Sequence, residues 1–231
     1  MIGVYDYTVV LTYLSALSAG AGIIVSLNGN GHPYLGTFFL LFCGLCDAFD
    51  GKVARTKKNR SVFEQKFGIQ IDSLSDLVAF GVLPGCIGNA MIRVSPSLPE
   101  LPRIKTQTRI EFGVALVLFA IILWYILAAL IRLANYNVTE EDRQKSETGV
   151  RKYYDGLPVT ASSIIFPTVM LFQYIDPMDI TVIYFAVMFV MSFLFVLKVK
   201  IPKPTMKGIF VFIGIGFIEF IVLGYYWFIK T

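Results

Sequence analysis

Long apolar runs separated by short polar stretches dominate the hydropathy pattern of the chain. Each run spans about 18 to 25 residues, which is the length that a helix needs to cross a hydrocarbon core of ~30 Å. The runs are continuously hydrophobic and lack the alternation that is typical of outer-membrane barrel strands. The pattern therefore predicts seven membrane-crossing helices, near 8–27, 34–55, 68–93, 110–134, 157–175, 179–197 and 208–229.

The overall composition points to the same environment. Hydrophobic residues make up 56% of the 231 residues and charged residues only 16%, and the mean hydropathy is +0.68. This composition leaves too little polar surface to cover a soluble protein of this size. We therefore expect an all-α fold, a polytopic integral membrane helical bundle that forms a single domain over residues 1–231.

Lysine and arginine are distributed unevenly among the connections between the predicted helices. Fifteen of the 20 lie in or beside the second, fourth and sixth connections. Cytoplasmic loops of membrane proteins carry such an excess of cations. We therefore expect a multi-pass protein of the cell (cytoplasmic) membrane, with its N-terminus and even-numbered connections in the cytoplasm against anionic lipid. The sequence contains no separate basic domain, so nucleic acid is not an expected partner.

Four aspartates stand at the edges of the second and third apolar runs. Asp47 and Asp50 are three residues apart, while Gly68, Asp72 and Asp76 recur at intervals of four, so each set shares one helix face. An aspartate near the centre of a membrane helix costs about 2.5–3.5 kcal/mol on insertion scales. Because the intervening connector returns the chain to the same membrane surface, we expect the four carboxylates to converge near the cytoplasmic boundary.

Carboxylates that share one site repel one another, so shared protons or cations must offset their charge. Hard divalent ions prefer oxygen ligands, and pairs of such ions are a recurring device for displacement at phosphorus. Gly51 and Ala54 leave the helix surface beside Asp47 nearly free of side chains, and the guanidinium of Arg55 suits phosphate oxygens. The residues alone therefore indicate a metal-assisted phosphoryl-type transfer. Simple neutralisation by nearby lysines and arginines accounts for single aspartates but not for the whole pattern.

The segment from Asp47 to Asp76 resembles the signature of the CDP-alcohol phosphotransferases. It reads DAFDGKVAR and then GIQIDSLSD, which matches D-x2-D-G-x2-A-R and G-x3-D-x3-D at every fixed position. The resemblance implies a core of six helices, to which the run at about 208–229 would add a C-terminal span. It also implies a homodimer.

Other segments resemble the phosphatidylserine synthases within this family. They are IDSLSDLVAFGVLPG, RLANYN at 132–137 and YDGLP at 154–158. This resemblance implies transfer of the phosphatidyl group from CDP-diacylglycerol to the hydroxyl of L-serine, with release of CMP, in phospholipid biosynthesis. The sequence departs from the family at two points: the twelve-residue connector between Arg55 and Gly68 is longer than usual, and Asn135 stands where an arginine is common.

The resemblance further implies roles for individual residues in a catalytic motif at 47–76. Asp76 would be the general base that accepts the proton of the serine hydroxyl. Two divalent metal ions, Mg²⁺ or Mn²⁺, would be held by Asp47, Asp50, Asp72 and Asp76. The nucleotide would be bordered by Asp47, Gly51, Ala54, Arg55 and Gly68. The acceptor would be contacted by Arg132 and Asn137.

Two alternatives to a serine-specific enzyme remain open at this point. The first keeps the chemistry and changes the acceptor to glycerol-3-phosphate or an inositol phosphate, which would require a denser basic pocket than Arg132 supplies. The second is a membrane ion or proton carrier that uses intramembrane acids. A carrier would spread its acids along a transmembrane path, whereas these acids gather near one membrane face.

Overall fold

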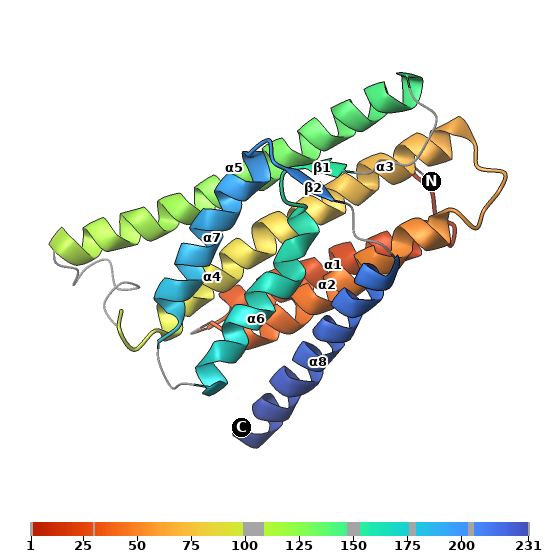
Figure 1. Ribbon diagram of the computed structural model, residues 1–231. Coiled ribbons are helices and arrows are strands. Elements are labelled where there is room, and N and C mark those ends of the chain that lie inside the picture. The colour runs from red at the N-terminus through yellow and green to blue at the C-terminus, as the bar shows by residue number, and fades with distance from the viewer. Residues whose placement is uncertain are drawn as a thin grey trace.

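The computed structural model describes residues 2–29, 31–98, 109–146, 153–175, 179–202 and 206–230. These residues form an elongated helical bundle with two short strands (Figure 1). The helices are α1 Val10–Leu27, α2 Pro33–Ala54, α3 Val62–Asp76, α4 Leu83–Val94, α5 Arg109–Ser146, α6 Ser162–Ile175, α7 Thr181–Val196 and α8 Met206–Lys230. The strands β1 Tyr153–Asp155 and β2 Lys200–Pro202 pair antiparallel.

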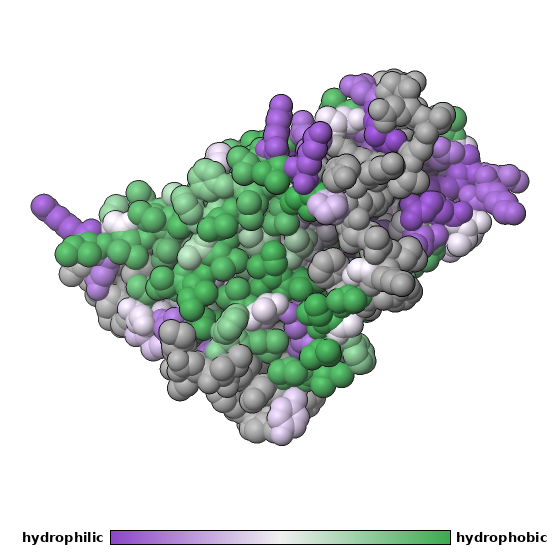
Figure 2. Space-filling model, viewed as in Figure 1, coloured by the Kyte–Doolittle hydropathy of each residue, from purple (hydrophilic) through white to green (hydrophobic). Residues whose placement is uncertain are grey.

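The prediction of a helical membrane bundle is confirmed. A π-helical segment, Leu77–Val82, joins α3 and α4 into one long helix, so each of the predicted runs corresponds to a helix. Within the described residues, four spans are long and apolar enough to cross a membrane, and α6 and α7 are apolar but shorter. Figure 2 shows a broad apolar face, with polar residues gathered towards the ends of the bundle. The four spans are Val10–Leu27, Pro33–Ala54, Val62–Val94 and Arg109–Arg143.

Two of the predicted helix boundaries are wrong by six residues or more. The third helix begins at Val62 and not near 68, because Ser61 and Glu64 form a capping box that satisfies its first backbone N–H groups. The fourth continues to Ser146 and not to 134, and an ion pair between Glu140 and Arg143 supports its polar end. About half of the twelve-residue connector is therefore the first part of α3, and a short loop remains between α2 and Ser61.

The π-helical segment after α3 is held by hydroxyl groups from three neighbouring helical elements. Pro84 has no backbone N–H, so the carbonyl of Phe80 lacks its usual α-helical donor. Tyr125 of α5 donates its hydroxyl to this carbonyl at 2.9 Å, and Ser162 of α6 does so at 3.5 Å. Tyr184 of α7 donates to the carbonyl of Pro84 at 2.8 Å. Unpaired carbonyls are costly away from water, so these bonds fix α5, α6 and α7 around the end of α3.

The C-terminal helix α8 packs on α2 and α6, as Figure 1 shows along one side of the bundle. The rings of Phe38 and Phe220 meet edge to face with their centres 5.1 Å apart. Glu219 is buried and accepts a hydrogen bond from Thr168 of α6. The predicted C-terminal span is thus a helix that joins the bundle through both apolar and polar contacts.

Candidate active site

Helices α2 and α3 bring three of the four predicted aspartates together. The candidate ligand oxygens of Asp47, Asp50 and Asp72 all lie within 4.8 Å of one another. Asp50 is 9% exposed, and the other two are partly buried. Asp76 lies one turn beyond Asp72 and interacts electrostatically with the other three, but its carboxylate is not part of the 4.8 Å group. Three of the four carboxylates therefore converge as expected, and the carboxylate of Asp76 lies outside their group.

The donor set suits a hard divalent cation. All three groups offer carboxylate oxygens, which Mg²⁺ and Mn²⁺ prefer, whereas zinc sites draw mainly on histidine and cysteine. Three close and partly buried carboxylates also repel one another unless protons or cations offset their charge. Among the residues that the structure describes, this is the one group of three acidic, histidine or cysteine side chains with such spacing. It marks the best candidate for a metal centre.

Two glycines beside the aspartates are each covered by an arginine side chain. A Cβ atom at Gly51 would lie 3.5 Å from Nη2 of Arg55, and a Cβ atom at Gly68 would lie 2.7 Å from Nη2 of Arg60. Arg55 is the predicted arginine that follows the last residue of α2, Ala54. Arg60 was not among the predicted site residues, because it belongs to the connector and not to the motif. The structure thus places two guanidinium groups against the two glycines of the motif.

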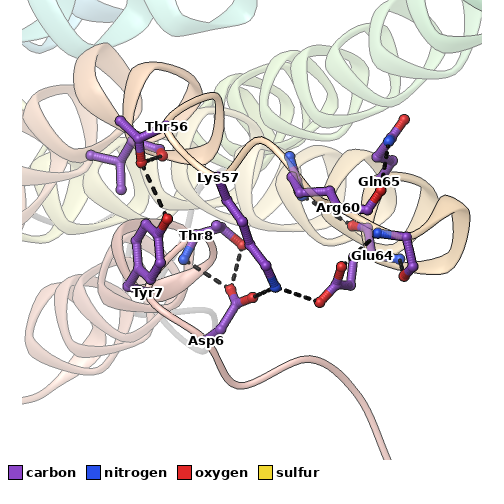
Figure 3. A network of polar contacts seen from close by, with 10 residues as sticks. Asp6, Tyr7, Thr8, Thr56, Lys57, Arg60, Glu64 and Gln65 are labelled. Atoms are coloured by element: carbon purple, nitrogen blue, oxygen red, sulfur yellow. Dashed lines mark hydrogen bonds and ion pairs between the residues drawn. The ribbon is translucent and has the colours of Figure 1, made fainter.

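The connector between α2 and α3 is tied to the N-terminal segment by a network of polar contacts. Nζ of Lys57 contacts Oδ2 of Asp6 and Oε1 of Glu64, each at 2.6 Å (Figure 3). Asp6 also accepts hydrogen bonds from Thr8. The ammonium of Lys57, followed by Thr8, lowers the pKa of the Asp6 carboxyl to about 2. These contacts join the chain start, the connector and the first turn of α3.

Both predicted acceptor residues lie on α5, in different surroundings. Arg132 is 6% exposed, and its guanidinium lies 5.4 Å from the centre of the Tyr136 ring. We expected this arginine near the end of its helix, but α5 continues past it to Ser146, and Arg132 is a buried residue within that helix. Nδ2 of Asn137 donates to Oγ of Ser73 at 2.8 Å. Asn137 therefore connects α5 to α3 at the residue that follows Asp72.

The YDGLP segment closes the end of α7. Gly156 adopts φ +79°, and a Cβ atom there would lie 2.8 Å from the carbonyl oxygen of Phe195. The N–H groups of Gly156 and Leu157 donate to the carbonyls of Val199 and Leu194 at 2.8 and 2.9 Å. Only glycine tolerates this conformation and this close approach. The segment therefore binds carbonyls at and beyond the end of α7, which its own helix leaves unpaired.

Comparison with known proteins gives relatives that are named as serine phosphatidyltransferases or as an archaetidylserine synthase. A yeast protein, the CDP-diacylglycerol–serine O-phosphatidyltransferase of Saccharomyces cerevisiae, is 34% identical over 155 residues, or 64% of this chain and 48% of its own length. The protein of that name from Helicobacter pylori is 25% identical over 152 residues, 65% of this chain and 52% of its own. The archaetidylserine synthase of Methanothermobacter thermautotrophicus is 25% identical over 198 residues, 86% and 70% of the two chains.

The match to a family model is more extensive than the match to the first two relatives. The chain spans about half the length of the yeast and Helicobacter proteins. The model of the CDP-alcohol phosphatidyltransferases matches residues 8–198, a range that contains all four aspartates and both glycines of the motif. The protein belongs to the CDP-alcohol phosphatidyltransferase family.

Proposed function

We propose that the protein transfers the phosphatidyl group of CDP-diacylglycerol to the hydroxyl of L-serine and releases CMP, as a step of phospholipid biosynthesis. The observation that carries the proposal is the close group of Asp47, Asp50 and Asp72 on the two motif helices. Serine is favoured as the acceptor because two of the relatives are named as serine phosphatidyltransferases and a third as an archaetidylserine synthase.

Asp47, Asp50 and Asp72 would hold two divalent ions, Mg²⁺ or Mn²⁺, with a share from Asp76. When bound, such ions would offset the negative charge of the diphosphate and of the departing CMP. The protein's own task at this centre is to hold the carboxylates close together from two separate helices. Their mutual repulsion, which is unfavourable in the absence of cations, then becomes a source of cation affinity.

The nucleotide part of the donor would lie along the motif face of α2 and α3. Asp47, Gly51, Ala54 and Gly68 would border the nucleotide, and the lack of side chains at the two glycines leaves room for arginine side chains beside it. The guanidinium of Arg55 already lies over Gly51, where its planar fork can donate to phosphate oxygens. The acyl chains of the donor would remain in lipid, so the reaction would occur at the membrane boundary.

Asp76 would accept the proton of the serine hydroxyl as its oxygen attacks the phosphorus that carries diacylglycerol. A new phosphorus–oxygen bond forms to serine while the bond to the CMP oxygen breaks, and its electron pair leaves with CMP. This single displacement needs no covalent enzyme intermediate, so the residues contribute mainly by orientation. The place of Asp76, outside the three-carboxylate group and one turn away, supports a role different from that of the other acids.

The acceptor would lie between the acids and α5. Arg132 would pair with the carboxylate of serine, and Asn137 would border the same space. The hydrogen bond from Asn137 to Ser73 supports this placement, because it brings α5 against the helix that carries Asp72 and Asp76. We further propose that the site faces the cytoplasm, with the N-terminus on the same side of the cell membrane, and that the protein is a homodimer.

The test is an acceptor panel with the purified protein in detergent micelles that contain CDP-diacylglycerol and Mg²⁺ or Mn²⁺. We expect CMP release with L-serine and only background release with glycerol-3-phosphate, with inositol phosphate or without acceptor. If release requires one of the phosphate-bearing acceptors instead, serine is the wrong acceptor. If no acceptor supports release, the proposed reaction is wrong.

A further inference from the structure

We propose that Arg60 is a second guanidinium of the donor site and binds the anionic nucleotide part of CDP-diacylglycerol opposite Arg55. The inference rests on the proposed function, because it assigns a further binding residue to the same site. Arg60 lies outside the motif, in the connector that is longer than usual in the family. The motif therefore did not indicate Arg60, and only its position in the structure makes it a candidate.

The Arg60 side chain lies over Gly68 of α3. Its Nη2 atom lies 2.7 Å from an ideal Cβ position at Gly68, too close for a side chain to begin there unless the guanidinium moves. Gly68 is one turn before Asp72 on the same flank of α3. Nη2 of Arg55 likewise lies close to an ideal Cβ position at Gly51, at 3.5 Å. Gly51 directly follows Asp50 on α2. Each arginine therefore lies over a motif glycine that is within one helical turn of an aspartate of the carboxylate centre.

The guanidinium of Arg60 does not use all of its hydrogen-bond donors within the described residues. Nη2 of Arg60 donates to the carbonyl of Glu64 at 3.0 Å. Nε of Arg60 is buried and has no acceptor among the described residues. Buried donors are normally paired, and the Nε edge of arginine, with the second Nη2 hydrogen, forms a fork that fits a phosphate group. A nucleotide phosphate is the chemical partner that this edge suits and that the proposed reaction supplies.

The connector that carries Arg60 is held in place before any ligand binds. Lys57 bridges Asp6 and Glu64 on one side of Arg60 (Figure 3). Ser61 caps α3 on the other side, and Nε2 of Gln65 donates to the carbonyl of Arg60 at 3.1 Å. The backbone of Arg60 is therefore anchored, so little conformational freedom is lost when its guanidinium binds an anion.

The test is nucleotide binding by the full-length protein in detergent, with CMP and Mg²⁺ as the probe and isothermal titration as the readout. In R60Q the Kd for CMP should rise about tenfold or more, the effect of losing charge-assisted hydrogen bonds. R60K keeps the charge without the fork and should give an intermediate Kd. The KM for CDP-diacylglycerol should rise in parallel, while the KM for serine stays unchanged.

Two neighbouring substitutions separate binding from local structure. S61A removes the cap of the same helix end, and K58Q removes an exposed cation of the same connector; both should keep the Kd for CMP within about twofold of wild type. Unchanged CMP binding in R60Q overturns the inference, and so does an equal loss in S61A. If R60Q weakens CMP binding but serine supports no CMP release, the inference stands and the acceptor assignment fails. If the wild-type protein binds no CMP, both proposals fail.

Discussion

At the scale of single residues, Asp76 differs from the other three acids in position. It is the last residue of α3, directly before the π-helical segment, and lies outside the close group of carboxylates. π-Helical turns often occur at functional sites, because they change the direction of the side chains around them. We therefore assign proton transfer to Asp76 and most of the cation binding to Asp47, Asp50 and Asp72.

The substitution D76N should lower turnover by about a hundredfold or more, the usual contribution of a general base. Binding of CMP and of Mn²⁺, followed by titration and by electron paramagnetic resonance, should stay within a few-fold of wild type. D50N is the matched control, because it removes a carboxylate of the close group and should weaken Mn²⁺ binding. Turnover by D76N close to the wild-type rate would rule out the base assignment.

The ion pair of Asp6 and Lys57 should make the stability of the protein depend more steeply on pH in acid. Lys57, followed by Thr8, lowers the folded-state pKa of Asp6 from 3.8 to about 2. A lowered carboxyl pKa contributes stability that is present above pH 3.8 and is lost as the pH falls towards 2. The melting temperature of the wild type should therefore fall more steeply between pH 4 and pH 2 than that of D6N, as measured by thermal unfolding in detergent. Parallel curves for the two proteins would contradict this interpretation.

A site residue could be predicted from the sequence where the pattern that indicates it lies within one short segment. The aspartates and Gly51 repeat at helical intervals within two short segments, so their spacing alone placed them on shared faces. Arg60 gave no such signal, because it lies in the connector, and its contact with Gly68, eight residues later, follows from the path of the chain into α3. The bond of Asn137 to Ser73 joins segments 64 residues apart, and no pattern within either segment predicts that partner.

At the scale of helices and strands, apolar runs predicted where the helices lie better than where they end. The start of α3 and the end of α5 are polar, so hydropathy placed both ends too far inside the helices. Ser61 followed by Glu64 is a local capping signal that could have corrected the predicted start of α3. The pairing of β1 with β2 joins Tyr153–Asp155 to Lys200–Pro202. Each strand has only three residues, too few for the pattern that predicts a strand.

The π-helical segment gives a prediction for stability. In Y125F the buried carbonyl of Phe80 loses its 2.9 Å donor and keeps only the longer contact from Ser162. Loss of a buried hydrogen bond that leaves its partner unsatisfied costs about 1–3 kcal/mol. The free energy of unfolding in mixed micelles should fall by that amount in Y125F. The exposed Tyr5 provides a control, because Y5F removes a hydroxyl bond at the surface; equal losses in both variants would contradict the assignment.

At the scale of the whole molecule, the distribution of cations predicts the orientation. The N-terminus and the connector between α2 and α3 lie at the same end of the bundle (Figure 1) and are joined through Lys57. With fifteen of the 20 lysines and arginines in or beside the even-numbered connections, this end should face the cytoplasm. The proposed active site would then open towards the compartment that supplies nucleotide donors and serine.

The orientation can be measured by labelling single cysteines in a background where Cys43, Cys46 and Cys86 are replaced by alanine. A cysteine at Lys58, which is exposed in the connector, should react with a membrane-impermeant maleimide only after the cells are opened. A cysteine at Ser97, beyond the end of α4, should react in intact cells. The reverse pattern would show that the orientation is inverted.

The central claim is that the acidic centre of α2 and α3 joins serine to a phosphatidyl group. Its most direct test is the transfer of ¹⁴C-labelled L-serine into chloroform-soluble lipid by the purified protein. We expect labelled phosphatidylserine that requires both CDP-diacylglycerol and a divalent cation, disappears with chelator, and falls to background in D50N. Absence of labelled lipid from the wild-type protein under these conditions, or undiminished labelling in D50N, would contradict the account.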